Sequence, residues 1–177
     1  MQASYKFKKV FINLLAALLC FAFFNAHAKP ITGAFGLKLG STIMNYDLKE
    51  VLGGHRLDKF DGDFFEGVYV YSLPNSKKIT KISAQRWSCT ENEKHALIDS
   101  IKNLYSEHDV VKTKKGFDKP YEYLISDKNE RYIGIYCSDI DRYKSKIVID
   151  YFDKNLQSQY SIEQQDTLKK QINRNNL

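Results

Sequence analysis

The first 28 residues limit what the rest of the chain can form, because they have the pattern of a cleavable export signal. Three lysines between residues 6 and 9 precede an almost entirely apolar run of 15 residues, Val10–Phe24, and the segment ends in Ala26-His27-Ala28. A basic start, an apolar middle and small residues at the exit are typical of a secretory signal peptide. A membrane span needs about 20 apolar residues, so the run is too short to remain as an anchor. We therefore expect cleavage after Ala28 and a periplasmic or secreted protein without a stable membrane span.

Residues 29–177 have the length of one domain. A chain of about 150 residues buries roughly 70% of its unfolded surface, which is enough for one hydrophobic core. Three of the 27 basic residues and none of the 21 acidic residues lie in the signal segment, which leaves a net charge of +3. This small charge and the expected export argue against a nucleic-acid partner.

The mature chain keeps two cysteines, Cys89 and Cys137. Thiols tend to pair in oxidising compartments, so we predict a disulfide between them. The alternative is a reactive or metal-binding thiol pair, but the sequence has no CxxC spacing and no histidine beside either cysteine.

Alternating apolar and polar residues predict an antiparallel sheet of five to seven strands. In residues 131–138, for example, Ile133, Ile135 and Cys137 share one face of a strand, and Tyr132 and Tyr136 share the other. The predicted strands cover residues 31–39, 56–60, 64–73, 78–87, 121–126, 131–138 and 145–152, and residues 110–119 read as a basic loop.

The main helix is predicted to begin at Thr90. Thr90 and Glu93 have the spacing of a capping box, and the apolar residues that follow lie on one helical face. That face must pack on the sheet. A short N-terminal helix is predicted from Asn45 to Leu52, and a C-terminal helix from Ser161. The predicted fold class is α+β.

No catalytic, cofactor-binding or metal-binding motif is visible. His55, His95 and His108 belong to no GxSxG, HExxH or similar pattern, and the acidic turns lack the ligand series of a calcium loop. We assign no catalytic residue, metal ligand or cofactor, and we expect binding rather than catalysis, with enzymatic activity left open.

Tyrosines give the one candidate binding surface. Several of them alternate along predicted strands and would gather on the sheet face opposite the main helix. Tyrosine is enriched in protein interfaces, but such residues also stabilise a half-exposed sheet by cross-strand packing, and both interpretations stay open. The candidate residues are Tyr69, Tyr71, Tyr121, Tyr123, Tyr132 and Tyr136.

A short segment resembles known exported proteins. Residues 35–41 (FGLKLGS) followed by residues 47–53 (DLKEVLG) are similar to the opening strand and helix of small exported bacterial modules, namely outer-membrane assembly lipoproteins and β-lactamase-inhibitor-like domains. The resemblance covers about 20 residues. It implies a non-enzymatic binding role and supplies no functional residue.

These observations predict an exported protein-binding module, such as an inhibitor, an immunity protein or an envelope-assembly factor. Its expected partner is another envelope or secreted protein. The alternative is a small extracytoplasmic hydrolase of cell-wall or other polymeric substrates, whose acidic and histidine side chains would come together only in the fold.

Overall fold

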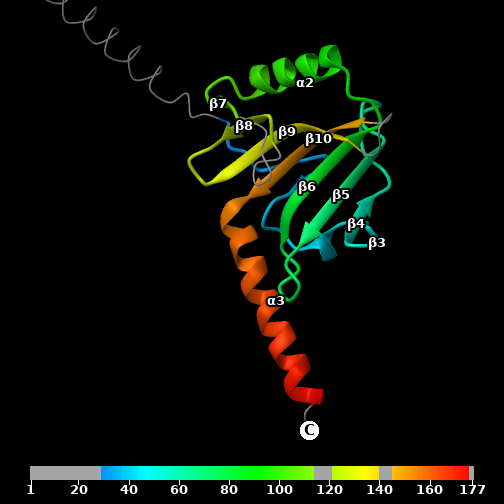
Figure 1. Cartoon of the computed structure of the whole chain (residues 1–177), viewed down its shortest axis with the longest axis vertical. Helices are drawn as coiled ribbons and strands as arrows, with labels where there is room; N and C mark the ends of the chain where they lie inside the picture. The colour runs from blue at the N-terminus through cyan, green and yellow to red at the C-terminus, as the bar shows by residue number, and fades with distance from the viewer. Residues whose placement is uncertain (1–28, 114–120, 140–144, 176–177) are drawn as a thin grey trace, which may run out of the picture.

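The computed structural model describes residues 29–113, 121–139 and 145–175 (Figure 1). The predicted signal segment, residues 1–28, lies outside the described residues. Within the described ranges, an eight-stranded antiparallel sheet is accompanied by a two-stranded hairpin and two α-helices. The large sheet consists of β3 (Lys49–Val51), β4 (Gly54–Leu57), β5 (Gly67–Ser72), β6 (Ile79–Arg86), β7 (Asp109–Lys112), β8 (Tyr123–Ser126), β9 (Arg131–Asp139) and β10 (Ser145–Asp153).

The large sheet joins two antiparallel meanders. Strands β3 to β6 pair in sequence order, and so do β7 to β10. The last strands of the two meanders, β6 and β10, pair with each other at the centre of the sheet. The helix α2 (Glu91–Leu104) connects the meanders, and the hairpin of β1 (Gly33–Ala34) and β2 (Leu37–Lys38) precedes them.

One face of the sheet packs against α2 to form the core. Ile133 and Ile135 of β9 are buried there together with Ile98 and Ile101 of α2. The capping box at Thr90 is present, since its hydroxyl oxygen accepts a hydrogen bond from the Glu93 N–H at 3.2 Å. The predicted α+β class, the antiparallel sheet and the main helix on one face are therefore confirmed. The predicted number of five to seven strands is too low, because the large sheet alone has eight strands within the described residues.

The predicted N-terminal helix from Asn45 to Leu52 is wrong. The structure has a short 3-10 helix, η1 (Ile43–Asn45), whose N-cap is Thr42, followed by the edge strand β3. A helix of eight residues is marginal by itself in water. Pairing of β3 with β4 satisfies the backbone of this segment instead, while the Leu52 side chain at the turn is fully exposed.

Other parts of the prediction also differ from the structure. Residues 31–39, predicted as one strand, form the hairpin of β1 and β2, which pair with each other across a turn. The segment read as a loop from residue 110 begins inside β7, where Val110 and Val111 pair with β8 and add an edge strand. The C-terminal helix α3 (Lys154–Asn175) starts seven residues before Ser161. Asp153 Oδ1 accepts a hydrogen bond from the Leu156 N–H at 3.1 Å, as an N-cap residue does, so the helix begins directly after β10.

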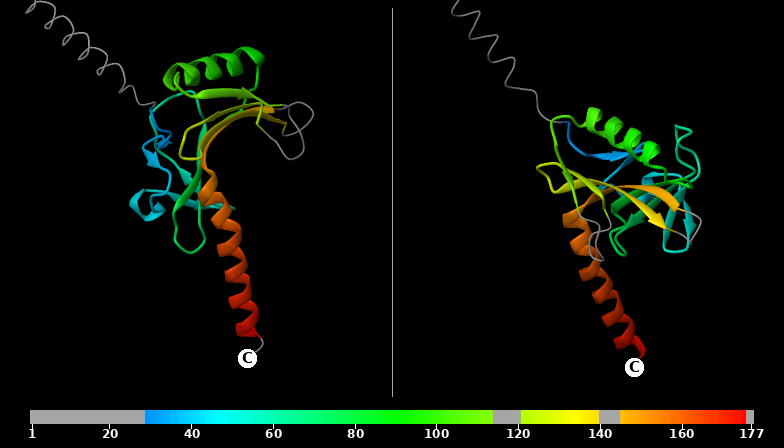
Figure 2. Two further views of the ribbon diagram at one scale, coloured as in Figure 1. Left: turned by 90° about the vertical axis from the view of Figure 1, so that its left-hand side faces the viewer. Right: turned by 45° about the horizontal axis from the view of Figure 1, so that its top comes forward.

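Only the first turns of α3 lie against the sheet. Glu163 Oε2 accepts a hydrogen bond from the Asn75 N–H at 2.8 Å, which ties the helix to the turn between β5 and β6. Beyond this contact the helix runs away from the sheet, whereas α2 lies across the sheet (Figure 2). Neither helix of the described chain is long and apolar enough to cross a membrane.

Candidate functional site

The sheet face opposite α2 carries a cluster of aromatic side chains, which we call the tyrosine face. Val68 and Val70 of β5 are buried in the core, so the alternating Tyr69 and Tyr71 lie on the opposite side. The same alternation on β9 places Tyr132 and Tyr136 there. The tyrosine face consists of Tyr69, Tyr71, Tyr121, Tyr132, Tyr136 and Phe152.

Aromatic rings pack against one another in the middle of this face. The Phe152 ring stacks with Tyr121 and with Tyr132, both at a centroid distance of 5.3 Å, and Tyr136 meets Tyr121 edge-on at 5.4 Å. Gly134 makes this arrangement possible. A Cβ at that position would overlap the Tyr121 ring and come within 2.7 Å of its Cγ.

A buried carboxylate lies at the centre of the tyrosine face. Asp150 is 1% exposed, and its Oδ2 accepts a hydrogen bond from the Tyr121 hydroxyl at 3.1 Å. The Lys81 ammonium is 3.7 Å from the same oxygen and 4.2 Å from the centroid of the Tyr71 ring. Asp150 Oδ1 is buried and has no hydrogen-bond partner in the described part of the chain. The charge of Asp150 is thus partly balanced by Lys81 and held under the aromatic rings.

This environment keeps the neighbouring phenols protonated. Burial raises the pKa of Tyr121 and of Tyr136, and the negative charge of Asp150 raises both further. The pKa of Tyr71 is raised by the same two causes. The three hydroxyls are therefore hydrogen-bond donors over the whole physiological pH range.

Five of the six predicted tyrosines lie on this face, and Tyr123 does not. Tyr123 pairs with Ile135 on β9 and packs against the core on the α2 side. Residues two apart share a face only inside a strand, and β8 begins at Tyr123. Tyr121 lies before the first residue of the strand, so the alternation does not apply to it. Its ring covers Gly134 on the sheet face opposite α2. The sequence prediction missed Asp150, Lys81 and Phe152, although strand alternation on β10 and β6 could have placed them.

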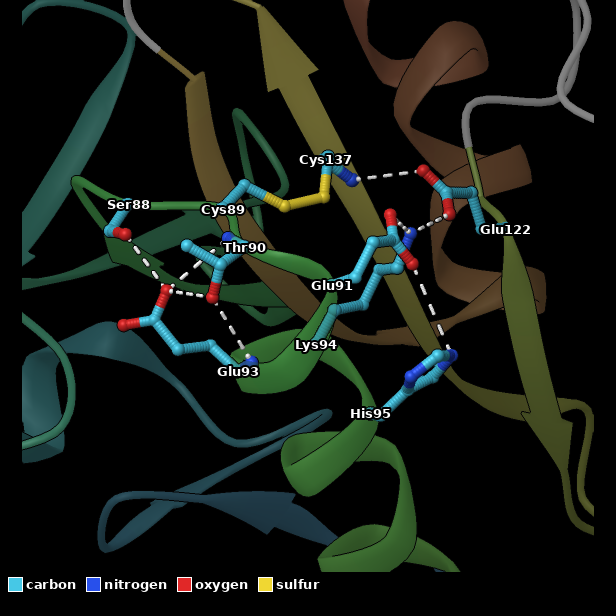
Figure 3. The surroundings of a disulfide bond; sticks show 9 residues. All are labelled: Ser88, Cys89, Thr90, Glu91, Glu93, Lys94, His95, Glu122 and Cys137. Atoms are coloured by element: carbon cyan, nitrogen blue, oxygen red, sulfur yellow. Dashed lines mark hydrogen bonds and ion pairs between the residues drawn. A yellow bond between two sulfur atoms is a disulfide. The ribbon is translucent and has the colours of Figure 1, made fainter.

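The predicted disulfide Cys89–Cys137 is present and fixes α2 on the opposite face (Figure 3). Its Cα atoms are 6.0 Å apart, and Cys89 directly precedes the capping box of α2. The buried Lys94 of α2 adds a second connection, because its ammonium lies 2.7 Å from Glu91 Oε1 and 2.8 Å from Glu122 Oε2. Glu122 Oε1 in turn accepts a hydrogen bond from the Cys137 N–H at 3.4 Å.

Glu93 is the centre of a hydrogen-bond network at the start of α2. Its Oε2 accepts bonds from the Ser88 and Thr90 hydroxyls, each at 2.8 Å, and its Oε1 accepts one from the Arg86 Nε–H at 3.1 Å. These donors lower the pKa of Glu93 to about 2, with Ser88 as the largest cause. The carboxylate is therefore ionised throughout the physiological range and supports the cap.

The three histidines lie on separate elements. His55 is on β4, His95 is exposed on α2 with Glu91 Oε2 at 4.0 Å, and His108 follows α2 with its Nε2 2.7 Å from the Lys29 carbonyl oxygen. Among the described residues, no group of three or more His, Cys, Asp or Glu side chains is placed to hold a metal ion.

Comparison with known proteins gives no relative: no family model, no curated protein and no solved structure matches this chain. The function must therefore be argued from the residues of the chain itself.

Proposed function

We propose that this protein is an exported binding module that contacts another envelope or secreted protein through its tyrosine face. The observation that supports this proposal is the gathering of five tyrosines on the sheet face that α2 leaves uncovered. Tyrosine buries a large contact area with only two side-chain torsions to order, and it is enriched in the central residues of interfaces.

The packing of the rings strengthens this proposal. Tyr121, Tyr132 and Tyr136 are held by stacking and by the Asp150 hydrogen bond, so little side-chain freedom remains to be lost on binding. Trp87, which is 61% exposed, lies at one end of β6 with the Lys146 ammonium 5.9 Å from its ring. A centre rich in aromatic side chains with a polar rim is the usual anatomy of a protein interface.

The disulfide supports the expected compartment. Structural disulfides persist in oxidising compartments outside the cytoplasm and are rare inside it. Together with the predicted signal segment, this bond supports a periplasmic or secreted protein. The short resemblance of residues 35–53 to exported binding modules adds no support, because these residues form part of a hairpin, a 3-10 helix and an edge strand instead of a strand followed by a helix.

Site-specific photo-crosslinking tests the proposed surface. A photoreactive phenylalanine analogue replaces Tyr69 or Tyr132 in the protein expressed in its native host, and the control replaces Asp99, which is exposed on α2. We expect both tyrosine positions to cross-link to the same envelope or secreted protein, and the α2 position to give no such product.

Reconstitution with the identified partner makes the test quantitative. The double variant Tyr69→Ala/Tyr132→Ala should weaken binding at least about tenfold, as the loss of interface anchors does, while Trp87→Ala should change it less. Thermal unfolding of each variant shows whether the fold is kept. Cross-links from Asp99 alone, or unchanged affinity of a folded double variant, would refute the proposal.

A further inference from the structure

Asp150 lies where the two meanders of the sheet meet. It is in the middle of β10, directly opposite Ser83 of β6 on one side and Gly134 of β9 on the other. Both neighbours are small, and the Tyr121 ring covers Gly134. Because Asp150 is 1% exposed, a protein that binds the tyrosine face cannot reach its carboxylate without displacing the rings.

The burial of this carboxylate is unfavourable for folding. Its Oδ1 has no hydrogen-bond partner within the residues that the structure describes. Its Oδ2 is 3.7 Å from the Lys81 ammonium, which is close enough for an ion pair but too far for a hydrogen bond. An unsatisfied buried acceptor destabilises the folded state, and apolar side chains often replace a buried ion pair without loss of stability. The stability of the fold therefore does not by itself explain a carboxylate at this position.

Asp150 connects aromatic rings that belong to different meanders. On the side of the second meander, its Oδ2 accepts the hydrogen bond of the Tyr121 hydroxyl at 3.1 Å. On the side of the first meander, it attracts Lys81, whose ammonium lies 4.2 Å from the centroid of the Tyr71 ring. One oxygen atom thus holds Tyr121 directly and Tyr71 through Lys81.

The hydrogen bond adds a directional restraint to the packing of the Tyr121 ring. Tyr121 precedes β8 and lies outside any strand, so its ring is placed by side-chain contacts. Its ring contacts with Phe152 and Tyr136 depend weakly on the exact offset of the rings, whereas the hydrogen bond to Asp150 holds the hydroxyl at one point. Rings that are already ordered lose less freedom when a partner binds.

We propose that Asp150 is a positioning residue for the tyrosine face, which orders the rings of both meanders into one binding surface without touching the partner. This inference rests on the proposed protein contact and adds the residue that orders its surface. Its signature is a separation of stability from binding, because removal of the charge pair keeps the fold but frees the rings.

Two variants separate the effects of the charge pair and the hydrogen bond. Asp150→Leu/Lys81→Leu removes both charges, and leucine branches at the same carbon atom as aspartate. Its urea midpoint should stay near that of the wild type or exceed it, because no buried charge is left without its partner. In Asp150→Asn the amide oxygen can still accept from the Tyr121 hydroxyl, so only the contact between Lys81 and the Tyr71 ring should weaken.

Nuclear Overhauser contacts of the disulfide-bonded protein report the order of the rings without a partner. The contacts from Tyr121 to Phe152 and Tyr136 should be strong in the wild type and weak in the folded double leucine variant. Arg131→Met/Asp153→Asn is the matched control, because it removes another ion pair of β9 and β10, with Nε and Oδ2 3.2 Å apart. Asparagine keeps the N-cap of α3, so this control should retain the Tyr121 contacts.

Affinity for the protein that cross-links to positions 69 and 132 completes the test. The double leucine variant should bind this protein about tenfold more weakly than the wild type, and the control variant should bind it normally. Unchanged ring contacts, or normal affinity of the double leucine variant, would overturn the positioning role. A double leucine variant much less stable than the wild type would show that Asp150 serves the fold instead. These outcomes leave the cross-links intact, whereas the absence of the cross-links removes the proposed contact and this role together.

Discussion

Replacing Gly134 by alanine tests the packing on which the tyrosine face depends. Gly134 is in the middle of β9, directly beneath the Tyr121 ring, and a Cβ there would overlap that ring. Because the site is closed by the backbone of β9, the ring has to move. Its stacking with Phe152 and its hydrogen bond to Asp150 would then be lost together.

The expected cost follows from these two contacts. An aromatic pair contributes about 0.5–1.5 kcal/mol, and a hydrogen bond to a charged group about 1.5–3 kcal/mol. Alanine is favoured over glycine within a strand by about 0.5–1 kcal/mol, which offsets part of the loss. The net destabilisation should be about 1–4 kcal/mol, which lowers the melting temperature by roughly 2–16 °C in a chain of this size.

Urea unfolding of four proteins measures this effect: wild type, Gly134→Ala, Tyr121→Ala and the double variant. Once the Tyr121 ring is removed, the alanine at 134 has nothing to displace, so the two substitutions should be strongly non-additive. Gly67→Ala is the matched control, since its Cβ would meet only the movable Tyr69 side chain at 3.0 Å. Additive effects, or a Gly134→Ala variant as stable as the wild type, would refute the placement of the ring.

Three further perturbations have definite expected results. Replacing both disulfide cysteines by alanine should lower the free energy of unfolding by up to about 4 kcal/mol, because the bond closes a loop of 48 residues; equal urea midpoints would contradict this. The pKa of Glu93 is lowered to about 2 from an ordinary value of 4.5, so the free energy of unfolding should fall as the pH drops from about 4.5 towards 2. The variant Glu93→Gln has no carboxylate to protonate, so its melting temperature should depend less on pH in this range. Burial raises the pKa of Tyr136 above its ordinary value of 10, so the unfolded state loses this proton at a lower pH than the folded state does, and the free energy of unfolding should fall as the pH rises above 10. Tyr136→Phe should reduce this dependence of the free energy on pH, and an unchanged dependence would contradict the prediction.

Local signals in the sequence were sufficient for several elements. The capping box at Thr90 and the apolar stripe after it predicted α2, because both depend only on residues within a few positions of each other. The alternation in β9 predicted that strand for the same reason. The disulfide was predictable because Cys89 and Cys137 are the two cysteines that follow the predicted signal segment.

Elements whose stability comes from a distant partner were not predictable in this way. Residues 49–51 form a strand because β4 is beside them, although their local sequence favours a helix. The first residue of α3, Lys154, donates its backbone N–H to the carbonyl oxygen of the distant Glu130 at 3.0 Å. The Asp153 cap of this helix is by contrast a local signal that the prediction overlooked. The predicted signal segment and the binding role of the tyrosines stay predictions.

The sequence by itself determined the alternation of side chains along each strand, and therefore which residues share a face within that strand. Only the tertiary structure decided which of the two faces stays open, because the disulfide and the Lys94–Glu122 ion pair hold α2 on the other one. The tertiary structure also decided that the Tyr121 ring lies over Gly134 and that its hydroxyl donates a hydrogen bond to Asp150. The physical reason is that alternation is a property of neighbouring residues, whereas these contacts join segments whose distance is set by the pairing of the whole sheet.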